Sequence, residues 1–295
     1  MVLLREAARI FNSKELAAFA EGDPEFLLKV ASRYKDDLGD FFSARDVFDF
    51  CYNDSKSNYR NEYFIKSLIV QKILLGRHSL NTATMINEFR VGFSKADCVV
   101  LNGSSTCYEI KSEYDSLARL PEQLNSYLKL FDRVYVVTPE KHLQKVIECL
   151  PCGVGVLKLS RRNTLSEYVE AKNSSQPVDV DVLMDSLRKN EYLTLVECFF
   201  GSVPDVASGA IYDTCKELLS SVDSVSLRKE FCNVLKRTRY VDGDFLSSLP
   251  GSLLAAGVEY CFTSASKAAL VDNLDIKFSK DALCTIPYSE VNVMS

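Results

Sequence analysis

Two residues of opposite charge, Glu109 and Lys111, lie two positions apart in a run that otherwise has the character of a buried strand, residues 106–111. Side chains at positions i and i+2 of a strand project from the same face of a sheet. A lone buried charge is costly, so these two need each other, a metal ion or a ligand as partners. The spacing therefore indicates a site.

A second strand-like run, residues 95–101, carries one carboxylate, Asp97. The turn sequence at residues 102–105 predicts that the two runs form an antiparallel hairpin. If Asp97 shares the face of Glu109 and Lys111, two carboxylates and a lysine converge on a volume that fits one hydrated cation. Glu88, on a further alternating run at residues 85–92, could reach the same face across a turn near residues 92–94.

The elements after this hairpin predict a parallel crossover. Leucines and Phe131 recur at helical spacing between residues 117 and 131, which indicates an amphipathic helix. The apolar run at residues 133–137 then fits a buried strand parallel to the one with Glu109, reached by a right-handed crossover. Strand, strand, strand, helix and strand is the expected order.

This order resembles the PD-(D/E)XK nuclease superfamily, in which an acidic residue on one strand and an E-x-K on the next bind Mg²⁺ and cleave phosphodiesters. Gln123 and Tyr127 resemble the Q-x-x-x-Y motif of its RecB-like branch, which includes nuclease-like proteins of bacteria and phages. Glu62, near the start of an expected helix at residues 61–69, fits a glutamate that the superfamily often places beside the metal. One departure is Lys95-Ala96, where many members have proline or glycine.

The resemblance implies a role for each of these residues. Asp97 and Glu109 would ligate Mg²⁺, for which Mn²⁺ could substitute, with the carbonyl of Ile110 as a third ligand. Lys111 would orient or deprotonate the attacking water and stabilise charge on the phosphate. Glu62 or Glu88 would hold a second metal ion or a water molecule. Gln123 and Tyr127 would contact the scissile strand or brace the metal ligands.

Each residue also has a plainer interpretation. Glu109 and Lys111 could form a solvated pair on an edge strand, and Asp97 could bond to a turn at the start of its strand. Gln123 and Tyr127 could be ordinary surface and core residues of a helix. What favours the site is that all of them occur together in the required order.

Composition is typical of a water-soluble protein of the cytoplasm. The chain of 295 residues is 47% hydrophobic, and no apolar run approaches the roughly 18 residues needed to cross a bilayer. The ten cysteines are scattered, which favours free thiols in a reducing compartment. The net charge of −5 is an objection to a nucleic-acid enzyme, but basic residues cluster locally and suit phosphate contacts. These are Lys158, Arg161 and Arg162, together with a second group at residues 228–239.

Three regions are expected along the chain. Residues 1–56 form a helical arm, which ends in a polar run at residues 53–58, and residues 57–172 form a nuclease core of the restriction-endonuclease type. After a linker, residues 178–295 form a mainly helical domain that could bind DNA, a protein partner or a second copy of the chain. The last strand of the core is expected at residues 165–171, and the tail beyond about residue 260, which includes residues 285–288, receives no assignment.

The sequence thus predicts a mixed α/β fold and a Mg²⁺-dependent deoxyribonuclease, compatible with a defence, repair or mobile-element role. The alternative is a catalytically silent, nuclease-like scaffold that binds DNA or a protein, since one fold can carry several functions.

Overall fold

The computed structural model describes residues 2–284. The chain divides into two compact units, with boundaries after Ser67 and after Gly243. The first unit is built from both ends of the chain and the second from its middle, residues 68–243.

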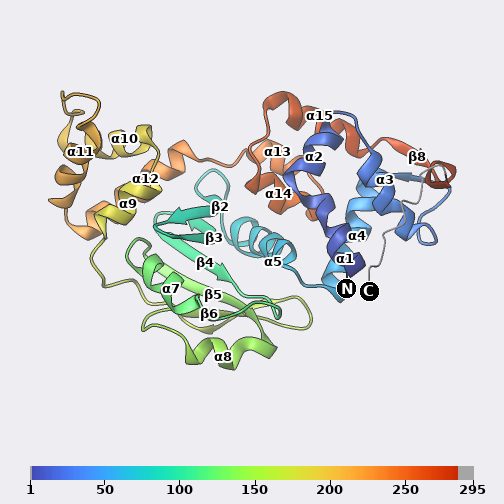
Figure 1. Ribbon diagram of the computed structural model, residues 1–295, viewed down its shortest axis with the longest axis horizontal. Coiled ribbons are helices and arrows are strands. Elements are labelled where there is room, and N and C mark those ends of the chain that lie inside the picture. Colours follow the sequence, from blue (N-terminus) through green and yellow to red (C-terminus); the bar gives the residue numbers. More distant parts are fainter. Residues whose placement is uncertain (1, 285–295) are drawn as a thin grey trace, which may run out of the picture. The chain divides into compact units, whose positions relative to one another are not determined.

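The first unit is helical, with one small sheet that joins the two ends of the chain (Figure 1). Strands β1 (Phe41–Ser43) and β8 (Lys277–Ser279) pair antiparallel. Asn273 strengthens this closure by donating a hydrogen bond to the carbonyl of Phe19 at 2.8 Å. The helices are α1 (Val2–Ala7), α2 (Ser13–Ala20), α3 (Glu25–Ala31), α4 (Ala44–Asn58), α13 (Gly243–Ser248), α14 (Leu254–Glu259) and α15 (Ser264–Leu274), with 3-10 turns at Ala8–Phe11, Ser32–Tyr34, Gly251–Leu253 and Lys280–Cys284.

Helix α4 begins and ends for local reasons. Ser43 and Asp46 form a reciprocal capping box at its start, which satisfies free backbone N–H groups of the first turn. The polar run at residues 53–58 was expected to separate two regions, and this expectation is wrong because the helix continues to Asn58. Within the run, Ser55 is buried and Asp54 accepts a hydrogen bond from the Tyr34 hydroxyl, so one side of the polar stretch still packs.

The second unit contains a six-stranded mixed sheet in the order β2-β3-β4-β5-β6-β7 (Figure 1). Strands β2, β3 and β4 are antiparallel, β4, β5 and β6 are parallel, and β7 returns antiparallel. The expected mixed α/β fold, with antiparallel strands before a parallel crossover, is confirmed at this level. The strands are β2 (Thr84–Val91), β3 (Ser94–Leu101), β4 (Ser105–Ile110), β5 (Arg133–Pro139), β6 (Gly155–Leu159) and β7 (Leu165–Val169).

Helices join and flank this sheet. Helix α7 (Leu120–Leu128) makes the crossover from β4 to β5, and a 3-10 turn (Glu140–His142) with α8 (Leu143–Glu148) connects β5 to β6. Helix α5 (Glu62–Ile69) crosses the boundary between the units and continues through a π-helical stretch (Val70–Leu74) into α6 (Leu75–Arg77). A helical group follows the sheet: α9 (Val180–Ser186), α10 (Lys189–Phe200), α11 (Ile211–Ser220) and α12 (Ser224–Thr238).

One hydrophobic core runs from a face of the sheet through α7 into the helices α9–α12. Phe89 of β2 illustrates the continuity, since its ring lies 5.8 Å from that of Phe131 and 6.2 Å from that of Phe231. The expected domain of residues 178–295 is therefore divided: residues 178–243 belong with the sheet, and the described part beyond them belongs to the first unit. Residues 285–295 lie outside the described part.

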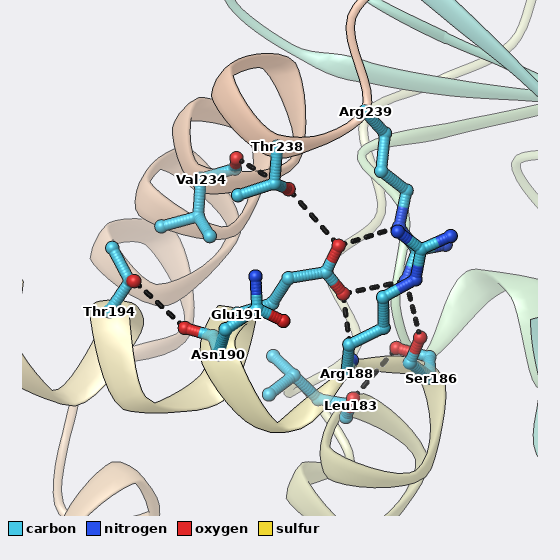
Figure 2. A network of polar contacts seen from close by, with 9 residues as sticks. All are labelled: Leu183, Ser186, Arg188, Asn190, Glu191, Thr194, Val234, Thr238 and Arg239. Atoms are coloured by element: carbon cyan, nitrogen blue, oxygen red, sulfur yellow. Dashed lines mark hydrogen bonds and ion pairs between the residues drawn. The ribbon is translucent and has the colours of Figure 1, made fainter. Parts of the chain in front are cut away.

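A buried ion pair fixes α10 against α12 (Figure 2). Glu191 is fully buried and accepts two hydrogen bonds from the Arg239 guanidinium, at 2.7 and 2.6 Å. The Thr238 hydroxyl and the backbone N–H of Arg188 complete its partners, at 3.0 and 2.7 Å. Because both carboxylate oxygens are satisfied, the charge can stay inside the helical group.

None of the helices in residues 2–284 combines the length and the apolar character that a membrane span requires.

Candidate active site

Three carboxylates line up across three neighbouring strands. In the β2–β3 ladder, Asn87 faces Cys98 and Phe89 faces Ala96, so Glu88 stands opposite Asp97. The β3–β4 register ends at Cys98 opposite Tyr108, and its next position places Asp97 opposite Glu109. That the side chains of Asp97 and Glu109 share a face stays a prediction, because Asp97 lies one position beyond the end of the ladder.

Asp97 stands where the β3–β4 ladder stops. Its Oδ2 accepts a hydrogen bond from the backbone N–H of Ile110 at 2.6 Å, so the side chain takes the role of a strand carbonyl. A carboxylate oxygen of Glu88 lies within 4.8 Å of one of Asp97. Glu88 has a φ of +54°, which is rare for a residue with a side chain, and the β2–β3 ladder is interrupted at this position.

Glu109 is more deeply buried than Lys111, since 1% of its side chain is exposed. Its Oε1 accepts from the Lys111 ammonium at 2.6 Å, and its Oε2 accepts from the Tyr127 hydroxyl at 2.9 Å. Burial raises the pKa of Glu109, although the charge of Lys111 and hydrogen bonds from Lys111, Tyr127 and Gln123 oppose that rise. The carboxylate is thus held by partners that favour its charged form.

Helix α7 supplies two of these partners. Gln123 accepts a hydrogen bond from the Lys111 ammonium at 3.1 Å, and Tyr127 is fully buried with its hydroxyl on Glu109. The same hydroxyl lies 2.8 Å from the carbonyl of Lys95 on β3. Because Gln123 and Tyr127 are one helical turn apart, a single face of α7 reaches both charged residues of the E-x-K triplet. The two therefore contact the expected site.

The basic residues expected to bind phosphate lie toward the far strands of the sheet. Lys158 on β6 stands opposite Thr138 of β5, and the neighbour of Thr138, Val137, accepts a hydrogen bond from the backbone N–H of Lys111. The Lys158 ammonium lies 3.8 Å from Glu140 and 5.7 Å from the ring centre of Tyr168. Arg161 and Arg162 are exposed in the turn from β6 to β7.

The second basic group, residues 228–239, is only partly available. Arg228 is buried and donates to the carbonyls of Leu128 and Gln176, and Arg239 belongs to the buried pair with Glu191 (Figure 2). The expectation that this whole group suits phosphate contacts is therefore wrong for these two arginines. Their long side chains reach inward, from α12 for Arg228 and from the residue directly after α12 for Arg239.

Glu62 starts α5 in the first unit, where its carboxylate pairs with Lys66 at 2.8 Å. Its proposed place beside the metal stays a prediction, as does the ligand role of the Ile110 carbonyl.

Sequence reasoning did not single out Thr138. It is the last residue but one of β5 and follows Val137, whose carbonyl accepts a hydrogen bond from the backbone N–H of Lys111. The Thr138 side chain is fully buried, and its hydroxyl has no hydrogen-bond partner among residues 2–284. A polar residue at the carboxyl end of a buried parallel strand was the signal that could have drawn attention to it.

The comparisons with known proteins identify a family. Residues 55–249 match the family described as Bacteriophage P4 protein cII, which is well over half of the chain. The chain belongs to that family. Protein cII of Enterobacteria phage P4 is 30% identical over 179 residues, covering 59% of this chain and 66% of that relative, just short of two thirds of its length. No solved structure matches the chain.

The matched stretch contains the whole sheet unit and every residue of the row from Glu88 to Glu109. The first unit falls mostly outside it. The candidate site therefore lies within the stretch that matches the cII family.

Replacing Asp97 by asparagine is expected to raise the melting temperature in the absence of metal. The change removes a charge whose neighbour Glu88 lies within 4.8 Å, while the amide oxygen can still accept from Ile110. Relief of this repulsion amounts to about 1 kcal/mol, or roughly 3 °C. Differential scanning fluorimetry measures the shift.

Asp115→Asn is the matched control, because Asp115 also accepts a backbone N–H, from Ser112 at 2.7 Å, on an exposed loop. A lower melting temperature for Asp97→Asn would contradict this expectation. It would mean that the Asp97 carboxylate stabilises the fold by more than its repulsion with Glu88 costs.

Proposed function

We propose that the sheet unit is a metal-dependent nuclease that hydrolyses phosphodiester bonds in DNA. The observation that carries the proposal is the hydrogen-bonded set of Glu109, Lys111, Gln123 and Tyr127, with Asp97 opposite Glu109 in the register. A purely structural sheet gains little from this arrangement, because burying a charged pair rarely stabilises a fold more than apolar side chains do.

The order of elements supports the finer assignment to a restriction-endonuclease-like core. Three antiparallel strands, a crossover helix and a parallel strand follow each other as in the PD-(D/E)XK superfamily, which the motifs of this sequence resemble. Asp97 lies on the second of these strands, the E-x-K spans the end of the third and the residue after it, and the Q-x-x-x-Y lies on the crossover helix.

The donor set fits a hard divalent cation. Carboxylate oxygens are the ligands that Mg²⁺ and Mn²⁺ prefer, and those of Glu88 and Asp97 lie within 4.8 Å of each other. Asp97 and Glu109 would hold the ion, with the Ile110 carbonyl, Glu88 and Glu62 as further expected ligands. When bound, the cation would lower the pKa of a water molecule and neutralise charge on the phosphate.

The chain's own residues would do the rest. The Lys111 ammonium, held by Glu109 and Gln123, can hydrogen-bond a water or a phosphate oxygen and offset developing negative charge. Tyr127 ties Glu109 to the carbonyl of Lys95, which fixes β3 and β4 relative to α7. Lys158, Arg161 and Arg162 would contact phosphates farther along the strand.

The test is incubation of the full chain with plasmid, linear duplex, forked and single-stranded DNA, and with RNA. The proposal requires cleavage of at least one DNA form with Mg²⁺ or Mn²⁺ and none with EDTA. Absence of cleavage on every DNA form would contradict it.

The competing function is a catalytically silent scaffold that binds DNA or a protein. One observation favours it: both oxygens of Glu109 already have partners within the chain, so the site is closed in its present form. If the chain bound DNA but cleaved it with none of the metal ions tested, the scaffold would be the better-supported hypothesis.

A further inference from the structure

The tip of the β2–β3 hairpin combines features that the site itself does not use. Val91 pairs with Ser94, so Gly92 and Phe93 form a two-residue turn. Gly92 has a φ of +57°, as the first position of a type II′ turn requires. This geometry leaves Phe93 at the apex with a relative exposure of 107%. The phenylalanine gains nothing by packing within the described chain.

Two cations face each other directly behind this apex. Arg90 pairs with Lys95 across the strands, and both side chains are exposed. Like charges at directly opposite positions destabilise a hairpin. Among residues 2–284 the Arg90 side chain makes one hydrogen bond, from Nε to the carbonyl of Gly92 at 3.3 Å, which leaves its terminal nitrogens available. An anionic ligand would add to the Glu88 carboxylate, which lies 3.2 Å from the Lys95 ammonium, in offsetting the repulsion.

The same hairpin carries the acidic row. The Lys95 ammonium lies 3.2 Å from Glu88, and Glu88 in turn lies within 4.8 Å of Asp97. Asp97 is four residues beyond Phe93, about 13 Å along a strand. That distance corresponds to about four stacked nucleotides at ~3.4 Å each. A strand held at the tip would therefore extend to the carboxylates.

We propose that Arg90, Phe93 and Lys95 form a contact for unpaired DNA, in which Phe93 stacks on a base and the two cations bind the flanking phosphates. Exposed aromatic rings beside positive charge suit single strands, since every base offers a face for stacking and every nucleotide a phosphate. The inference rests on the proposed nuclease and deepens it: the substrate is DNA with unpaired bases, such as single strands and forks.

The test is binding of fluorescein-labelled single-stranded and forked DNA by fluorescence anisotropy in EDTA, so that no cleavage is needed. Phe93→Ala is expected to weaken binding about tenfold and Phe93→Trp to preserve it. The double variant Arg90→Gln with Lys95→Gln should reduce the slope of log affinity against log salt by about 1.4 on single strands. The protein should bind blunt duplex DNA more weakly than single-stranded or forked DNA, and Phe93→Ala should change its affinity for blunt duplex little.

Phe200→Ala and the double variant Lys145→Gln with Lys189→Gln serve as controls, because these residues are exposed elsewhere on the same unit. Losses of binding in the controls equal to those at the tip would overturn the inference, as would unchanged binding of Phe93→Ala or no binding by the wild type. If binding depends on the tip residues but no DNA is cleaved in Mg²⁺, the proposed nuclease activity is contradicted and the proposed DNA contact is still supported.

Discussion

Lys111→Ala is expected to lower the rate of divalent-dependent DNA cleavage by about a thousandfold. Removal of a single group that offsets charge at a reacting centre typically costs between about 10² and 10³ in rate, and loss of a proton-transfer role costs a similar factor. Lys111 is placed for either role, 2.6 Å from Glu109 and 3.1 Å from Gln123 with 12% of its side chain exposed. Single-turnover cleavage in Mg²⁺ measures the loss.

The same substitution also affects the fold. Without the ammonium, the Glu109 carboxylate keeps Tyr127 but loses the cation that offsets its burial, so a lower melting temperature at neutral pH is expected. Gln123→Leu separates the two effects, because it leaves the Glu109–Lys111 pair intact. A loss of about tenfold is expected there, with little change in stability. Lys145→Ala, an exposed lysine on α8, is the control for a general loss of positive charge.

If the folded Lys111→Ala variant cleaved DNA at the wild-type rate, this site would not be the catalytic one. If Lys145→Ala lost as much activity as Lys111→Ala, the effect would be one of net charge.

Glu191→Ala is expected to destabilise the sheet unit by about 3–5 kcal/mol, or roughly 10 °C in melting temperature. Among residues 2–284, the substitution leaves the Arg239 guanidinium with the carbonyl of Ser186 (Figure 2) and the ring of Phe89, whose centre lies 5.0 Å away, as its remaining partners. Glu230→Ala is the surface comparison, since Glu230 pairs with Arg237 at 3.2 Å where the arginine is 60% exposed. A cost below about 1 kcal/mol is expected there. Urea unfolding measures both.

The double variant Glu191→Leu with Arg239→Met should recover much of the loss, because an apolar pair leaves no buried charge. It also keeps the test usable if the single variant does not fold. Equal costs for Glu191→Ala and Glu230→Ala would show that the buried pair contributes no more than a surface one.

The contribution of Glu191 should also depend on pH. Burial alone would raise the pKa of Glu191, but hydrogen bonds from Arg239, Arg188 and Thr238 and the charge of Arg239 hold it below the usual value. A folded pKa below the unfolded one means that the stabilisation is complete above about pH 4.5 and is lost as pH falls through the folded pKa. The difference in unfolding free energy between wild type and Glu191→Gln should therefore narrow below that pH.

Local pattern was enough to predict the sheet region. The alternation around Asp97 and Glu109, the turn at residues 102–105 and the apolar run at residues 133–137 each specify an element through its own residues. Their pairing follows, because a short turn forces an antiparallel hairpin and a crossover helix gives a parallel strand. The contacts of Gln123 and Tyr127 follow from a single helical turn facing β4.

Long-range features escaped prediction. The pairing of β1 with β8 joins two three-residue strands from opposite ends of the chain, and so few residues carry no periodicity. The burial of Arg228 and Arg239 depends on which side of α12 meets the core. Charge alone predicted exposed cations there, whereas the long side chains reach inward to carbonyls and to Glu191.

The positive φ of Glu88 was equally invisible. Glutamate carries no sequence signal for that conformation, and only the interrupted ladder opposite Asp97 reveals it.

Anomalous diffraction from crystals of the wild-type chain soaked in Mn²⁺ would locate the metal directly. A peak is expected within about 2.1 Å of oxygens from both Asp97 and Glu109, with the Lys111 ammonium moved off Glu109 and still near Gln123. No peak at saturating Mn²⁺, with Glu109 still bound to Lys111 and Tyr127, would contradict the assignment of this site to metal-dependent cleavage.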